Sequence, residues 1–140
     1  MLLGEYRHSL DGKGRVFLPA RWRGELGEDV IVSQGLDRCL YVMTPPKFEE
    51  FSRRLNALGV EQSDVRAYAR ILFSQSYEEG VDGQGRITIP PQLRTKLNLT
   101  KDLVLAGASW RGEVWDRSLY DAYQGGVQPR YEEIAEKLQF

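Results

Sequence analysis

The chain has 140 residues, of which 41% are hydrophobic and 28% charged, and a formal net charge of −1. This length supports one modest core or two closely joined half-cores, and it excludes two large domains. Its longest apolar runs are strand-sized, far below the roughly 20 residues of a membrane span, and its first residues lack the pattern of a secretory signal. We therefore expect a cytoplasmic protein without a membrane segment.

Two short strands, over 6–10 and 15–18, open the predicted structure. The residues between them are rich in Asp and Gly, which accept the backbone angles of tight turns, so we expect a β-hairpin. A short helix over 20–26 follows, and then a second strand pair over 30–34 and 39–43. Thr44 is a good N-cap, and Pro45 suits the first position of an amphipathic helix.

The same order of elements recurs 71 positions later in the sequence. Asp11-Gly12-Lys13-Gly14-Arg15 corresponds to Asp82-Gly83-Gln84-Gly85-Arg86. The second copy predicts strands over 76–81, 86–89, 103–107 and 113–115, a short helix over 91–97 and a helix near 119–123. Further helices are predicted over 63–73 and 129–138. The chain therefore contains a duplicated unit.

Four short strands in each copy cannot close a sheet alone, and exposed strand edges invite pairing. We expect the two copies to interleave into one pseudo-symmetric β-barrel with helices outside, a mainly β fold of the α+β class. The expected divisions are a first repeat over 5–47, a helical spacer over 48–75, a second repeat over 76–119 and a C-terminal helical segment over 120–140.

Each turn is followed by an arginine that can serve ligand binding or structure. An Arg on a stiff strand can bind phosphate or a guanine edge with two hydrogen bonds, while Gly14 and Gly85 allow close backbone approach. Asp11 and Asp82 can hold the arginines before binding. The alternative is that Asp11 with Arg15, and Asp82 with Arg86, are hairpin-closing ion pairs, and both interpretations can hold together.

Positive charge is concentrated near the N-terminus, where residues 1–23 carry three more basic than acidic side chains. Lys13, Arg7, Arg21 and Arg23 are further candidates for phosphate contacts, or ordinary surface charges. Arg23 recurs as Arg94, and at these helical positions we expect structural ion pairs.

Cys39 is the only cysteine and His8 the only histidine. This count excludes an intrachain disulfide and a zinc site built from several Cys or His ligands, and we expect no metal or other cofactor. Because Cys39 lies in an apolar strand-like run, we expect a buried, unreactive thiol.

The doubled Asp-x-x-Gly-Arg unit, with Pro19 and Pro90 after the second strand, resembles the swapped-hairpin DNA-binding family of the SpoVT-AbrB type. Over almost the whole chain, the arrangement resembles the MraZ family of bacterial transcriptional regulators. The resemblance implies that Arg15 and Arg86 contact DNA. Because Gln84 stands where the first turn has Lys13, we expect the first loop to be the principal contact.

The resemblance further implies a closed ring of identical chains, an octamer or dodecamer. Such a ring would bind short repeats of double-stranded DNA in the promoter of the chain's own division and cell-wall operon, associated with the nucleoid. An enzyme is disfavoured, because Glu78 and Glu79 have no imidazole dyad or metal cluster beside them. A ring-forming protein-interaction or assembly module is the alternative function.

Overall fold

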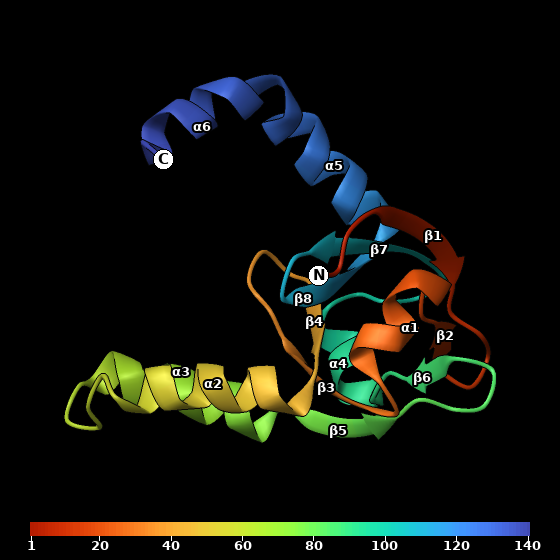
Figure 1. The fold of residues 1–140 in the computed structure, drawn as a ribbon, viewed down its shortest axis with the longest axis horizontal. Coiled ribbons are helices and arrows are strands. Elements are labelled where there is room, and N and C mark those ends of the chain that lie inside the picture. The colour runs from red at the N-terminus through yellow and green to blue at the C-terminus, as the bar shows by residue number, and fades with distance from the viewer.

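The computed structural model describes residues 1–140 and contains two copies of the same series of elements. Figure 1 shows the fold, in which helices surround a twisted sheet. The first copy consists of β1 (Glu5–Ser9), β2 (Arg15–Phe17), α1 (Ala20–Leu26), β3 (Asp29–Gln34), β4 (Leu40–Met43) and α2 (Pro45–Asn56). The second consists of β5 (Tyr77–Gly80), β6 (Arg86–Thr88), α4 (Pro91–Lys96), β7 (Asp102–Ala108), β8 (Arg111–Asp116) and α5 (Arg117–Val127). Between the copies lies α3 (Ser63–Ser74), and α6 (Tyr131–Leu138) ends the chain.

The copies interleave in a six-stranded antiparallel sheet of order β1-β7-β8-β4-β3-β5. Within each copy only β3–β4 and β7–β8 are paired as hairpins. The pairs β1–β7, β3–β5 and β4–β8 all join one copy to the other. Exchanging the two copies turns the strand order into its own reverse, which confirms the predicted interleaved, pseudo-symmetric arrangement.

The remaining strands, β2 and β6, form a separate two-stranded ribbon across the pseudo-twofold axis. Its register pairs Arg15 with Thr88, Val16 with Ile87 and Phe17 with Arg86. The predicted hairpin pairing is therefore wrong: the strands predicted over 6–10 and 15–18 form as β1 and β2, but each of them pairs with the other copy. A three-residue strand buries too little to fold as an isolated hairpin, and the partner copy supplies the missing ladder.

The predicted closure into a barrel is also wrong, because β1 and β5 remain at opposite edges of the six-stranded sheet. The ribbon strands are too short to bridge the two edges. Each of them is followed by a proline, Pro19 or Pro90, which has no N–H to continue a ladder. The ribbon instead covers one face of an open sheet.

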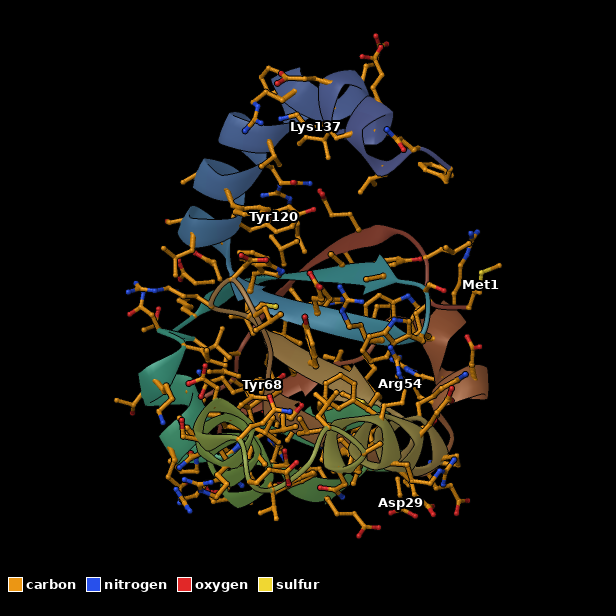
Figure 2. The ribbon with its side chains drawn as sticks, turned by 90° about the vertical axis from the view of Figure 1, so that its left-hand side faces the viewer. Met1, Asp29, Arg54, Tyr68, Tyr120 and Lys137 are labelled. Carbon is orange, nitrogen blue, oxygen red and sulfur yellow. The ribbon has the colours of Figure 1, made fainter.

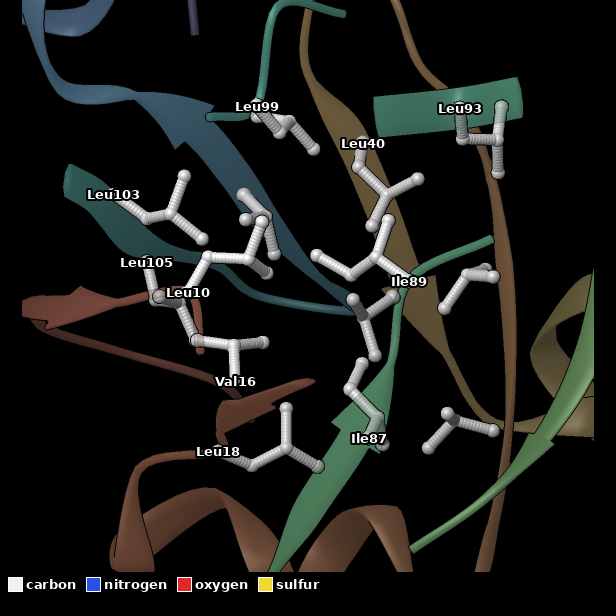
Figure 3. Packing of buried hydrophobic residues seen from close by; sticks show 14 of the residues in the cluster. Leu10, Val16, Leu18, Leu40, Ile87, Ile89, Leu93, Leu99, Leu103 and Leu105 are labelled. Carbon is white, nitrogen blue, oxygen red and sulfur yellow. The ribbon is translucent and has the colours of Figure 1, made fainter. Parts of the chain in front are cut away.

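The main core lies between this ribbon and the sheet. Figure 3 shows Val16 and Leu18 of one copy beside Ile87 and Ile89 of the other, and all four side chains are fully buried. Burying a side chain of this size stabilises the fold by about 1.5–3 kcal/mol. The ribbon is therefore anchored by contributions from both copies.

Helices cover the opposite face of the sheet. The α2–α3 pair packs on β3, and the beginning of α5 packs on β7 and β8. Here Cys39, Trp115 and Tyr120 are buried in a second, smaller cluster, and burial raises the pKa of the Cys39 thiol. The predicted burial of Cys39 is confirmed.

The chain ends in an arm formed by α5 and α6 that extends away from the sheet. Figure 2 shows Lys137 of α6 at the opposite end of the molecule from Asp29 of β3. Tyr120 ties the base of the arm to β1 by donating a hydrogen bond to Glu5 (2.6 Å). No helix combines the length and the apolarity needed to cross a membrane.

Candidate nucleic-acid interface

The first turn is organised by a single carboxylate. One oxygen of Asp11 accepts hydrogen bonds from the backbone N–H groups of Lys13 (2.9 Å) and Arg15 (2.8 Å). The other oxygen accepts from Arg15 Nε at 2.7 Å. Asp11 therefore fixes both the backbone of the turn and the base of the arginine side chain, which leaves the guanidinium end free to reach a ligand.

The second turn repeats this geometry. Asp82 accepts from the backbone of Gln84 and of Arg86, each at 2.9 Å, and from Arg86 Nε at 2.8 Å. The hydrogen bond from the backbone N–H of the arginine is the main cause of a lowered carboxyl pKa in both turns. The pKa of Asp11 falls to about 2, and that of Asp82 is also lowered. Both carboxylates are thus charged at neutral pH. The predicted ion pairs of Asp11 with Arg15 and of Asp82 with Arg86 are present, although the strands that these turns join pair with the other copy and form no hairpin.

The ribbon carries the two arginines on one face. Val16 and Ile87 point into the core, so their neighbours Arg15, Phe17, Arg86 and Thr88 alternate to the outside. Arg15 and Arg86 are diagonal neighbours across the pair, a position that separates residues by about 7–8 Å. We call these four residues the ribbon face.

The two halves of the ribbon face are unequal. Arg86 lies over the ring of Phe17, with the Cζ atom 5.7 Å from the ring centre, whereas Arg15 is paired with Thr88 and makes no cation–π contact. The Arg15 side chain is 29% exposed and that of Arg86 19%. Arg15 is the more available of the two.

Arg23 and Arg94 make no ion pair, contrary to the prediction. Each guanidinium instead packs against the turn glycine of the other copy: Arg94 against Gly14 and Arg23 against Gly85. Arg23 also donates from Nε to the Leu18 carbonyl at 3.0 Å. A planar guanidinium lies flat against bare backbone, and a glycine with no Cβ leaves the space for it.

A hollow adjoins each turn, and the two hollows differ in charge. Apart from the paired Asp11, the hollow between the first turn and α4 carries one charged side chain, Arg94. The hollow between the second turn and α1 carries Arg23 together with Glu28 and Asp29. The surroundings of the second turn are therefore the more acidic.

The remaining predicted basic residues occupy different places. Lys13 is exposed in the first turn and forms no ion pair, so its ammonium group is free. Arg7 lies on β1 and is held against α5 by Asp121 (3.1 Å), with Glu5 at 3.5 Å. Lys13 thus lies two residues from Arg15 in the same turn, whereas Arg7 is engaged with α5.

The turn motif alone does not predict that Phe17 and Thr88 belong to the ribbon face. The alternation of each strand after its turn was the available signal, since it assigns Phe17 to the same side as Arg15. No group of three or more His, Cys, Asp or Glu side chains is arranged to hold a metal ion.

Comparison with known proteins also finds two repeated units in the chain. A family model described as "MraZ protein, putative antitoxin-like" matches residues 1–71 and again residues 72–139. The transcriptional regulators MraZ of Carboxydothermus hydrogenoformans and Heliobacterium modesticaldum are each 44% identical over 138 residues, covering 99% of this chain and 96% of each relative. The protein of the same name from Acetivibrio thermocellus is 43% identical over the same share.

Proposed function

The chain belongs to the MraZ family, and on that premise we propose that it is a transcriptional regulator that binds double-stranded DNA through its ribbon face. The observation that carries the proposal is the placement of Arg15 and Arg86 on one outward face, each pre-oriented by an aspartate. Asp11 and Asp82, with Gly14 and Gly85, then serve to support the turns.

The ribbon suits the major groove of DNA, which admits a two-stranded β-ribbon. An arginine there can donate two hydrogen bonds to guanine. A separation of about 7–8 Å between the arginines matches about two base-pair steps of 3.4 Å. Lys13, exposed in the first turn, is suited to a phosphate contact beside the base contact of Arg15.

The first loop is the principal contact in this proposal. Arg15 is more exposed than Arg86, and it has no ring to hold it. Glu28 and Asp29 near the second turn repel phosphate, whereas the hollow beside the first turn has no comparable pair. Both the local charges and the exposure favour Arg15. For Arg7 we propose a weaker, peripheral phosphate contact, because it is already paired with Asp121.

A chain with a net charge of −1 has little overall attraction for DNA, but several linked copies can together bind it tightly. We propose a ring of identical chains that binds several short DNA repeats at once, because linking contacts raises avidity by about 10² to 10⁴. The α5–α6 arm supports assembly, since it exposes Tyr131, Leu138 and Phe140. An octamer or a dodecamer is the proposed size.

The proposed target is the promoter of the chain's own division and cell-wall operon, bound in the cytoplasm at the nucleoid. The chain would act without catalysis. The alternative is an assembly module that does not read DNA. The same apolar α5–α6 arm supports it, but it gives the ribbon face no role.

Footprinting on the DNA upstream of the chain's own gene tests the proposal, with a shuffled sequence as control. Wild type should protect repeated short sites, and Arg15→Ala should lose this protection while its sedimentation remains that of wild type. Arg86→Ala should weaken protection less. Assembled wild type that protects neither the native nor the shuffled DNA would support the assembly module instead.

A further inference from the structure

We propose that each repeat positions the DNA-facing loop of the other: Arg94 of the second repeat positions the first loop, and Arg23 of the first repeat positions the second. Both are positioning residues, which act through the loop backbone and not through contact with DNA. The importance of these positions for regulation rests on the proposed function, but the contacts themselves do not.

The support of the first loop is a direct packing contact. Gly14 is buried and has a φ of 78°, and a Cβ built there would lie 2.6 Å from Arg94 Cζ. The guanidinium therefore occupies the space of the missing side chain. The Gly14 carbonyl also accepts a hydrogen bond from Ile89 N at 2.8 Å, so the turn is held to the second repeat on two sides.

The second loop is held in the same way by the first repeat. Gly85 is buried with a φ of 84°, and a Cβ there would lie even closer to Arg23. The Gly85 carbonyl accepts from Leu18 N at 2.9 Å. The recurrence of packing and backbone bonds in both copies makes this a property of the interleaved fold.

Asp11 and Asp82 shape each turn, but their side chains bond only to residues of their own repeat. The contacts that hold each turn to the other repeat are the guanidinium packing and the backbone bond of the glycine carbonyl. Arg94 has no competing partner, because it forms no ion pair and its buried Nε has no hydrogen-bond partner. Its planar group is thus committed to the contact with Gly14.

If these roles are right, each arginine controls the loop of the other repeat, which proximity in the sequence does not predict. Arg23 lies eight residues from Arg15 in the same repeat, yet Arg94 is expected to control the first loop. If the first loop is the principal DNA contact, Arg94→Ala should weaken DNA binding more than Arg23→Ala, by about tenfold, the loss that corresponds to re-ordering about one backbone residue on binding.

Amide hydrogen exchange of the full-length chain without DNA tests the assignment. Arg94→Ala should speed exchange in residues 12–15 and leave residues 83–86 unchanged, and Arg23→Ala should do the opposite. Arg94→Lys, which keeps the charge and the stem but not the planar group, should also speed exchange in residues 12–15, and it replaces Arg94→Ala if that variant does not fold.

DNA affinity, measured on the same proteins with the upstream DNA, separates the two proposals. If wild type does not bind this DNA but the variants show the crossed pattern of exchange, the proposed function is refuted and the positioning roles are supported. Unchanged exchange in residues 12–15 of the Arg94 variants, or exchange that rises equally in both loops, would overturn the inference even if wild type binds.

Discussion

Substitution of Gly14 by Ala tests how closely the first turn is packed. The residue has a φ of 78°, which costs an L-amino acid about 1–2 kcal/mol. Its new methyl group would also overlap the Arg94 guanidinium, and overpacking of this kind costs about 1–3 kcal/mol. The free energy of unfolding should therefore fall by about 2–5 kcal/mol, and the melting temperature should fall by roughly 3 °C for each of these kcal/mol.

Gly12→Ala is the matched control, because it lies in the same turn without a positive φ and has no atom within 4 Å of its Cβ position. Reduced freedom of the unfolded chain should leave this variant unchanged or stabilised by up to about 1 kcal/mol. Urea titrations followed by circular dichroism give both values. In an Arg94→Ala background, Gly14→Ala should cost only the backbone part, about 1–2 kcal/mol. Equal stabilities of Gly14→Ala and Gly12→Ala would refute the described packing.

Three further predictions concern charge, thiol chemistry and the ribbon face. Because the folded pKa of Asp11 is lowered to about 2, the stability it contributes is complete above its unfolded pKa of about 3.9 and is lost as the pH falls towards 2. Asp11→Asn should thus make unfolding free energy depend less steeply on pH between about 4 and 2, and an identical slope in wild type would contradict this. Burial raises the pKa of Cys39, so the native protein should not react with a thiol reagent at pH 8 while the unfolded protein reacts fully; complete labelling of native protein would disprove the burial. Phe17→Ala removes an exposed cation–π contact with Arg86 and should lower unfolding free energy by about 0.5–1 kcal/mol in denaturant titrations, whereas a loss above about 2 kcal/mol would assign Phe17 to the core.

The order of elements could be predicted from sequence because it is encoded locally and twice. Turn residues such as Asp11 and Gly14 recur at the same offset as the prolines that end the ribbon strands, and each copy confirms the interpretation of the other. The choice of pairing partner could not be predicted in the same way. A strand such as β2 presents only Val16 to the core, which does not determine whether it pairs within its own copy or with the other.

The candidate site was predictable to the same extent. Arg15 and Arg86 stand out because each follows a turn and has an aspartate four residues before it. The contact between Arg94 and Gly14 has no local signal, since the two residues are 80 positions apart and meet only when the copies interleave. Arg94 corresponds to Arg23 and Gly14 corresponds to Gly85 at the same offset. This shared recurrence was the one sign in the sequence that the arginine and the glycine form a pair.

In the proposed function, Arg15 on the ribbon face reads DNA. Fluorescence anisotropy with labelled upstream DNA over a salt series tests this role, comparing wild type with Arg15→Ala and with Arg53→Ala, an exposed arginine of α2 as control. One lost base contact costs about 1–3 kcal/mol, so Arg15→Ala should bind at least about fivefold more weakly and lose its preference over shuffled DNA, while Arg53→Ala binds as wild type. Affinity and preference that are unchanged in Arg15→Ala at every salt concentration would contradict the claim.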